Sequence, residues 1–325
     1  MAERCNILIS SAGRRVGLIE AFRSSLHQLG VAGSIVASDM SSLAAARQIA
    51  DSAVTVPPAD SPEFVPALLE LCEREQIALV IPTIDPELPP LARAKPAFAS
   101  LGTTVAISDP ETIAIAADKH HTHEWLTANG FPTVTQTRLA DLEAERPEVL
   151  FPVVVKPAHG SASVGVRVIE SPAELASLSG DDIVVQSRAP GTEYTTDVYL
   201  DEAHRVRTTV PRERLEVRAG EVSKGRTVRH AALQELVTEV AATLPGAYGV
   251  LNVQAFVNND EIKVIEINPR FGGGFPLAYR AGADMPGWLI SEKLGRPIRL
   301  KEWQPDLVML RYDDAVYLSA SDVDL

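Results

Sequence analysis

Short apolar runs alternate with amphipathic segments through the first 110 residues, and this alternation constrains the fold more than any other feature. Candidate strands cover residues 5–10, 34–38, 53–56, 78–82 and 103–107, and candidate helices cover 14–29, 42–50, 62–75 and 86–99. Strands that alternate with helices form a parallel sheet wrapped on both faces. We therefore expect an α/β, parallel-sheet domain over residues 1–110.

The rest of the chain predicts two further units. Residues 111–185 have the pattern of a small α+β lid, and residues 186–325 that of a larger half with several strands and a helix over 231–244. The stretch 210–229 is expected to be a long, basic connection (Arg212, Arg214, Arg218, Lys224, Arg226 and Arg229). It forms either a solvated charged loop or a segment that closes over phosphates.

The segment 261–274, Glu-Ile-Lys-Val-Ile-Glu-Ile-Asn-Pro-Arg-Phe-Gly-Gly-Gly, carries the strongest functional signal. Its apolar residues predict a strand, on which Glu266 and Asn268 project to the same face because side chains alternate. A carboxylate and an amide oxygen are hard ligands suited to Mg²⁺, which usually bridges protein oxygens to nucleotide phosphates. Arg270 adds a permanent cation, and the glycines at 272–274 let the backbone approach a ligand closely. The alternative is a strand that runs into a glycine turn, with Glu266 merely exposed.

Upstream segments supply the other parts of a nucleotide site. Lys119 begins a helical segment, and Lys156 ends an apolar strand over 151–157, which delivers its ammonium group to a loop. That loop, 159–165, is small and polar, with backbone N–H groups free to hold phosphate. Two more strands follow, over 183–188 and 251–257. The series resembles the ATP-grasp superfamily, specifically the large chain of carbamoyl phosphate synthetase and its stand-alone single-copy ligase relatives.

The resemblance implies an N-terminal parallel-sheet domain followed by a two-part ATP-grasp fold, with ATP and Mg²⁺ (or Mn²⁺) between the two halves. It implies that the nucleotide contacts Lys119, Lys156, Gly160, Ser161, Ser163, Gln186, Ser187, Arg188, Ala189 and Glu193. It implies that the metal ligands are Gln254, Glu266 and Asn268, and that the catalytic cations are Arg270 and Lys156. Many relatives carry a carboxylate where Gln254 stands, so this metal site has one negative charge fewer.

The resemblance also implies the reaction: ATP phosphorylates a small carboxylate, and an amine attacks the acyl-phosphate to give an amide, ADP and phosphate. The carboxylate substrate is expected to be a small molecule such as an amino acid. One alternative is formation of carboxy or carbamoyl phosphate, which the single copy of the fold in this sequence disfavours. Another is a nucleotide-binding regulatory module, against which the complete set of cations and metal ligands argues.

Two sequence features indicate where the substrates bind. Arg14 and Arg15 occupy the first turn of a helix, where cations oppose the helix dipole but form a good anion site. Asp85 and Glu87 follow a strand of the N-terminal domain, at the sheet edge where ligands collect in open α/β sheets. Asp85 is explained equally well as a helix cap before a proline. For both carboxylates, the sequence therefore leaves two roles open: capping the helix, or binding the amine of a substrate.

Composition excludes several partners. A net charge of −13 argues against nucleic acid, which needs a basic face, and no apolar run approaches the ~20 residues that span a bilayer. Cys5 and Cys72 read as buried thiols, and no secretory signal is evident, so we expect a cytoplasmic protein with small-molecule substrates. A homodimer remains open.

Other nucleotide, metal and hydrolase sites fit the sequence poorly. Residues 11–17 lack the Gly-x-Gly-x-x-Gly spacing of a dinucleotide site, and the sequence holds no P-loop. His120, His121 and His123 lack a fourth zinc ligand. Ser161 and Ser163 have neither a paired base nearby in the sequence nor a nucleophile elbow.

Overall fold

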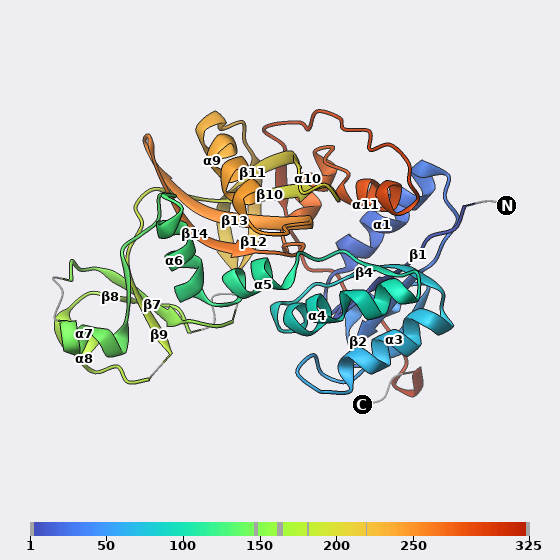
Figure 1. Cartoon of the computed structure of the whole chain (residues 1–325), viewed down its shortest axis with the longest axis horizontal. Coiled ribbons are helices and arrows are strands. Elements are labelled where there is room, and N and C mark those ends of the chain that lie inside the picture. The colour runs from blue at the N-terminus through green and yellow to red at the C-terminus, as the bar shows by residue number, and fades with distance from the viewer. Residues whose placement is uncertain (1–2, 146–148, 161–164, 181, 219, 323–325) are drawn as a thin grey trace.

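Three sheets organise the chain in the computed structural model, which describes residues 3–145, 149–160, 165–180, 182–218 and 220–322. Figure 1 shows the five-stranded N-terminal sheet at the lower right, the six-stranded sheet in the centre and the four-stranded sheet of the lid at the left. The mixed α/β and α+β fold expected from the sequence is confirmed.

The N-terminal sheet is parallel, in the order β3-β2-β1-β4-β5. Its strands are β1 (Asn6–Ile9), β2 (Ile35–Asp39), β3 (Ser52–Thr55), β4 (Ile77–Ile81) and β5 (Thr104–Val105), and its helices are α1 (Val16–Leu29), α2 (Ala45–Ile49), α3 (Phe64–Arg74) and α4 (Leu88–Ser100), with the short 3₁₀ turn η1 (Asp85–Glu87) before α4. Ile7 and Ile9 pack in the core below α1, whereas Leu8 packs in the core below α3 and α4. Both faces are therefore covered, as the near-continuous apolar strands predict.

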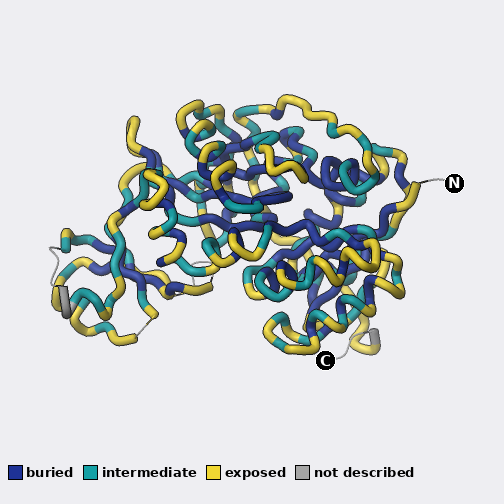
Figure 2. Tube along the Cα trace, viewed as in Figure 1, coloured by how far each residue is buried: buried dark blue, intermediate teal, exposed yellow. Residues whose placement is uncertain are grey.

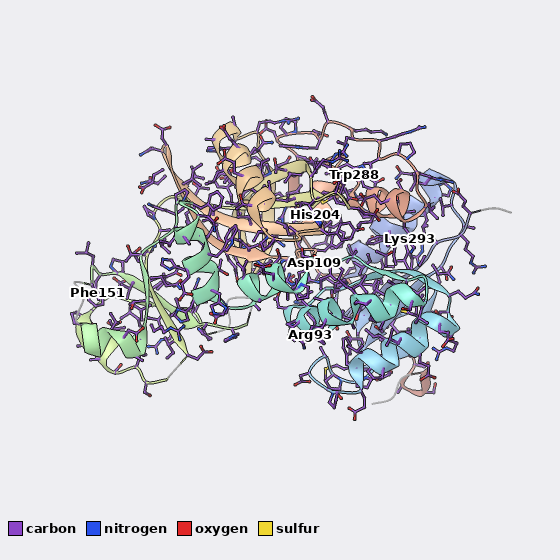
Figure 3. The ribbon with its side chains drawn as sticks, viewed as in Figure 1. Arg93, Asp109, Phe151, His204, Trp288 and Lys293 are labelled. Atoms are coloured by element: carbon purple, nitrogen blue, oxygen red, sulfur yellow. The ribbon has the colours of Figure 1, made fainter. Side chains whose placement is uncertain are left out.

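The lid sheet is antiparallel, in the order β6-β9-β7-β8. Its elements are β6 (Gln136–Arg138), α7 (Leu139–Glu145), β7 (Val153–Pro157), β8 (Arg167–Ile169), α8 (Pro172–Ala176) and β9 (Ile183–Ser187). A small core of Val153, Val155, Ile169 and Val185 holds it together. Phe151 lies at its outer end, far from Trp288 and Lys293 (Figure 3).

The six-stranded sheet has the order β14-β13-β10-β11-β12-β15. Its strands are β10 (Thr192–Leu200), β11 (Val206–Arg218), β12 (Glu221–Thr227), β13 (Gly249–Asn258), β14 (Glu261–Asn268) and β15 (Val308–Leu310). Helix α9 (Ala231–Thr243) covers one face and shares a core with Leu126 of α6 (Lys119–Ala128), which follows α5 (Pro110–Ala117). The prediction of a long connection over residues 210–229 is wrong, because most of this stretch forms the antiparallel strand pair β11 and β12.

The remaining elements join the six-stranded sheet to the N-terminal domain. Helices α10 (Phe275–Arg280) and α11 (Met285–Lys293) pack in the same core as α1, and the turn η2 (Ala320–Asp322) lies near the C-terminus. Figure 2 shows buried backbone running through the two large sheets where they meet these helices. No helix among the described residues is long and apolar enough to cross a membrane. The domain limits after residues 110 and 185 stay predictions.

Candidate active site

A cavity of about 960 Å³ lies between the lid and the open face of the six-stranded sheet, and its far end reaches Arg15 of the N-terminal domain. The sheet contributes mainly alternate residues of four neighbouring strands, because alternate side chains share a face. These residues are Glu193 and Thr195 of β10, Arg212 and Arg214 of β11, Asn252, Gln254 and Phe256 of β13, and Glu266 and Asn268 of β14. The opposite face packs on α9, so the polar face is free to line the cavity.

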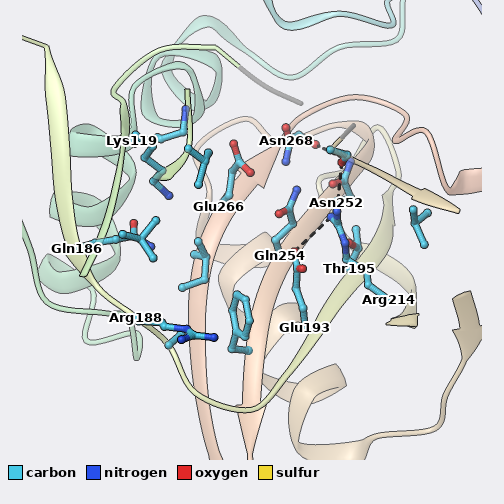
Figure 4. A pocket seen from close by; sticks show the side chains of 18 of the residues that line it. Lys119, Gln186, Arg188, Glu193, Thr195, Arg214, Asn252, Gln254, Glu266 and Asn268 are labelled. Atoms are coloured by element: carbon cyan, nitrogen blue, oxygen red, sulfur yellow. Dashed lines mark hydrogen bonds and ion pairs between the residues drawn. The ribbon is translucent and has the colours of Figure 1, made fainter. Parts of the chain in front are cut away.

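The three expected metal ligands meet on this face. Gln254 pairs with Glu266 across β13 and β14, and Asn252 pairs with Asn268 one step further along. Figure 4 shows the Gln254, Glu266 and Asn268 side chains directed into the same space. A carboxylate with amide oxygens is a donor set that fits Mg²⁺. No group of three or more His, Cys, Asp or Glu side chains in the described part of the chain could hold a metal, so an ion here would depend on these amides.

Two lysines approach the cavity from the side of the lid. The Lys119 ammonium donates to the carbonyl of Gly160 at 2.8 Å, which ties the start of α6 to the loop after β7. Lys156 is only 6% exposed. Burial lowers the pKa of Lys156 to about 8, against the attraction of Glu266 and with added repulsion from Lys119. Two neighbouring cations, one of them buried, form a place where an anion would be strongly stabilised.

The strand that leads from the lid to the six-stranded sheet supplies the next group. Gln186, Ser187, Arg188 and Ala189 all line the cavity. Gln186 is 5% exposed, and its side-chain oxygen has no hydrogen-bond partner among the described residues. A buried acceptor without a partner is costly and is satisfied by a ligand that donates to it. An adenine amino group is such a donor.

Glu193 lies at the same end of the cavity, across from Arg188 (Figure 4), and 3.3 Å from the Arg214 guanidinium. Burial raises the pKa of Glu193 above its usual value, although Arg214 opposes the shift. The position suits a carboxylate that accepts hydrogen bonds from sugar hydroxyls.

Arg270 lies at the junction of the six-stranded sheet and the N-terminal domain. Its Nε and Nη2 donate to the two carboxylate oxygens of Asp85 at 2.7 and 2.6 Å, and Nη2 also donates to Asn268 Oδ1 at 3.2 Å. Burial alone would lower the pKa of Arg270, but Asp85 holds it above its usual value. A bidentate ion pair of this kind fixes the orientation of the guanidinium plane as well as its position.

The expected substrate residues separate in the structure. Arg15 lines the cavity, whereas Arg14 is exposed and is not part of its wall. Glu87 is fully buried, and its carboxylate accepts from the Ser10 and Ser11 hydroxyls and the backbone N–H groups of residues 83 and 84. These bonds give Glu87 a structural task in joining two loops of the N-terminal domain. Asp85 holds Arg270 in this structure. Ser161 and Ser163 lie outside the described residues.

Asn252, the Arg212–Asp197 pair and the Arg15–Glu221 pair were not predicted from the sequence. Asn252 donates to the Arg270 carbonyl at 3.1 Å, and its spacing of two from Gln254 was the signal that could have found it. Arg212 forms a buried ion pair with Asp197 at 2.6 Å, both at most 2% exposed. Glu221 pairs with Arg15 at 3.3 Å. The first of these pairs bridges the neighbouring strands β10 and β11, and the second joins segments 206 residues apart, so neither pair could be predicted without knowing how the strands and domains meet.

The two cysteines, Cys5 and Cys72, are buried and are poor candidates for a nucleophile. Burial raises the pKa of Cys5 to about 11 and that of Cys72 to about 12, so both stay protonated at neutral pH. Neither lines the cavity.

Two α+β halves that face each other across a cation-lined cavity define a class of two-part nucleotide-binding folds. A family model described as a PylC-like N-terminal domain matches residues 7–106, and an ATP-grasp domain model matches residues 116–274. The chain therefore contains an ATP-grasp domain behind a PylC-like N-terminal domain, which confirms the resemblance to ATP-grasp proteins.

Similar proteins span several reactions. The carbamoyl phosphate synthase large chain of Campylobacter jejuni is 24% identical over 227 residues, 59% of this chain and 19% of its own length. The 3-methyl-D-ornithine–L-lysine ligase of Methanosarcina acetivorans is 26% identical over 193 residues, 54% of this chain and 46% of its own length. The match thus spans less than half the length of either relative.

The overall fold is also known from solved structures. The biotin carboxylase domain of Hydrogenobacter thermophilus 2-oxoglutarate carboxylase aligns with a TM-score of 0.74 at 19% identity, over 95% of this chain and 74% of that chain. At this identity, the likeness shows the fold alone.

Proposed function

We propose that this protein is an ATP-dependent, ADP-forming carboxylate–amine ligase, which joins a small carboxylate to an amine through an acyl-phosphate. One observation carries the proposal: Lys119, Lys156, Glu266, Asn268 and Arg270 line a single cavity. Phosphoryl transfer between anions needs cations around the moving group and little covalent help from the protein. A protein that only bound nucleotide would not need Arg270.

Each residue has a task in this proposal. Lys119, Lys156 and the backbone at Gly160 hold the ATP phosphates, and Ser161 and Ser163 are proposed to contact them as well. The 186–189 segment holds the adenine edge, and Glu193 accepts from the ribose.

Gln254, Glu266 and Asn268 would hold Mg²⁺ or Mn²⁺. A metal ion held by these residues would supply positive charge that offsets the negative charge of the phosphates. Arg270 stabilises the phosphoryl group as it moves. The ATP-grasp relative from Hydrogenobacter was crystallised with MgADP and bicarbonate, which supports the nucleotide and the metal.

We further propose small-molecule substrates and a cytoplasmic location. The two unpaired, buried cysteines suit a reducing compartment. The carboxylase relative crystallised as a dimer of its biotin carboxylase domain, which supports a homodimer here.

ADP release tests the function. The purified protein is given MgATP with a panel of amino acids and small carboxylates, each with and without added amines. We expect ADP release that requires both a carboxylate and an amine. Glu266→Gln should abolish it, whereas Glu261→Gln, which is exposed on the same strand and paired with Lys263, should not.

Other outcomes contradict the ligase proposal. ADP release supported by bicarbonate alone would favour the carboxy phosphate-forming alternative. Tight nucleotide binding without any ADP release would favour a regulatory module.

A further inference from the structure

The end of the cavity beyond Arg270 is lined by two opposite charges from different domains. Arg15, at the start of α1, and Glu221, at the start of β12, approach each other to 3.3 Å. Their side chains are 22% and 27% exposed, and both line the cavity. The charges of Arg270 and Asp85 act on the pKa of Arg15, so this pair adjoins the catalytic cation.

Arg15 is held at some energetic cost. Burial lowers its pKa, against the attraction of Glu221. It also precedes the first turn of α1, which contains no acidic residue to offset a cation at the positive end of the helix dipole. Among the described residues, the Arg15 side chain makes one hydrogen bond, to Glu221 at 3.3 Å, which leaves most of its five donors available. An anionic group in the cavity would relieve both costs.

Glu221 stays ionised beside it. Burial opposes the charge, but Arg15 and Arg311 overcome this and hold the pKa of Glu221 below its usual range. Arg311 donates to the second carboxylate oxygen at 3.0 Å from the outer side.

Gly273 leaves room for the pair. A Cβ at this position would come within 2.8 Å of Arg15 Nη1 and 2.9 Å of Glu221 Oε1. The glycine turn after Arg270 therefore closes against both charged groups at once.

We propose that Arg15 and Glu221 bind the α-carboxylate and the α-ammonium group of an amino acid, and that this amino acid is the substrate whose carboxylate is phosphorylated. The inference rests on the proposed function. A simple anion would be repelled by Glu221, and a simple amine by Arg15. A ligand that carries a carboxylate and an ammonium group on the same carbon can contact both residues, with its carboxylate on Arg15 and its ammonium group on Glu221.

The chemistry follows from this placement. The α-carboxylate, between Arg15 and Arg270, attacks the γ-phosphorus of ATP, and the bond to the bridging oxygen breaks with its electron pair leaving on ADP. The nitrogen of the second substrate then attacks the carbonyl carbon, loses a proton, and displaces phosphate. Glu221 keeps the first ammonium group protonated, so that this nitrogen has no free electron pair with which to attack.

The test pairs two variants with two analogues. Calorimetry with the ADP-bound protein compares the amino acid that supports ADP release with its amide, which lacks the carboxylate, and its des-amino acid, which lacks the ammonium. Wild-type protein should bind each analogue roughly 10- to 100-fold more weakly than the amino acid, because a charged hydrogen bond is lost. Arg15→Met should lose the preference over the amide only, and Glu221→Gln the preference over the des-amino acid only.

Matched controls guard against damage to the fold. Arg23→Met removes an ion-paired arginine of the same helix, and Glu216→Gln removes an ion-paired glutamate of the neighbouring strand, both outside the cavity wall. Both controls should keep the full preferences of wild type, and all four variants should bind ADP.

The outcomes separate the inference from the function on which it rests. Equal weakening of all three ligands in both cavity variants would show that the pair is only a bridge between domains, and would overturn the inference. ADP release that needs a carboxylate without an amino group would also overturn it, while leaving the ligase proposal standing. If none of the carboxylate–amine pairs in the panel supports ADP release, the ligase function is refuted instead.

Discussion

Asp85→Asn tests how the N-terminal domain contributes to catalysis. The substitution keeps the shape and one oxygen of the side chain but removes its charge and one of the two short bonds to Arg270. Arg270 is 9% exposed and Asp85 26%, so the remaining charge of Arg270 would be largely buried and only half-partnered. We expect the guanidinium group of Arg270 to stay in the cavity wall but to lose its fixed orientation.

Two magnitudes follow. Breaking a buried ion pair from one side costs about 3–5 kcal/mol, and because Asp85 is a quarter exposed and asparagine keeps one acceptor, we expect the unfolding free energy to fall by about 1–3 kcal/mol. Turnover should fall by roughly 10- to 100-fold, because misplacing a group that acts on the transition state by ~1 Å costs up to 10²-fold. The KM for ATP should change little, since Arg270 acts on charge that develops during transfer.

The assay is a double-mutant cycle. kcat and the KM for ATP are measured for Asp85→Asn, Arg270→Met and the double variant, with urea unfolding alongside. The double variant should be no slower than Arg270→Met, because Asp85 acts through Arg270. Asp51→Asn, at an exposed ion pair with Arg23 in the same domain, serves as the control. An unchanged or higher kcat in Asp85→Asn would refute the idea that Asp85 orients Arg270, and would leave it as a neutralising partner only.

Three further changes have defined outcomes. Glu266→Gln or Asn268→Ala should abolish Mg²⁺-dependent turnover while circular dichroism shows an intact fold, and full turnover at saturating Mg²⁺ would refute the metal assignment. Because burial lowers the pKa of Lys156 to about 8, its ammonium is protonated below pH 8 and discharges above it. ATP affinity should therefore fall as pH rises through 8, and calorimetry in two buffers at pH 8 should show proton uptake on binding that Lys156→Met removes; equal uptake in both proteins would contradict this. Gly274→Ala would place a Cβ 2.2 Å from Arg212 Nη1, so it should lower the unfolding free energy by roughly 1–3 kcal/mol, and a stable variant would show that the turn yields easily.

Local patterns were sufficient to predict most of the fold. The apolar runs and helix periods of the N-terminal domain correspond to the observed strands and helices within a few residues, and the strand that presents Glu266 and Asn268 is β14. Alternation alone put these two side chains on one face, because that rule depends on neighbours in sequence. The basic stretch over 210–229 was wrongly predicted as a connection, because neighbours in sequence do not show that two of its arginines line a cavity. Arg212 and Arg214 face the cavity, so β11 lacks the apolar alternation of a strand packed on a core, and the other basic residues of the stretch are largely exposed.

Pairs that join separate domains could not be predicted. Arg270 and Asp85 are 185 residues apart in sequence, and Arg15 and Glu221 are 206 apart. Their contacts depend on how the N-terminal domain docks on the six-stranded sheet, which no local spacing encodes. Asp85 therefore looked like a helix cap or a substrate contact, whereas its nearest charge is the arginine at the end of β14.

The fate of the γ-phosphate tests the central claim most directly. ATP labelled in that group is mixed with the protein, the carboxylate substrate and hydroxylamine. The proposal predicts ADP, transient label on the small carboxylate, a hydroxamate formed from it, and no label on the protein, since neither buried cysteine is a nucleophile at neutral pH. AMP with pyrophosphate as products, or a phosphorylated protein, would contradict the ADP-forming acyl-phosphate route.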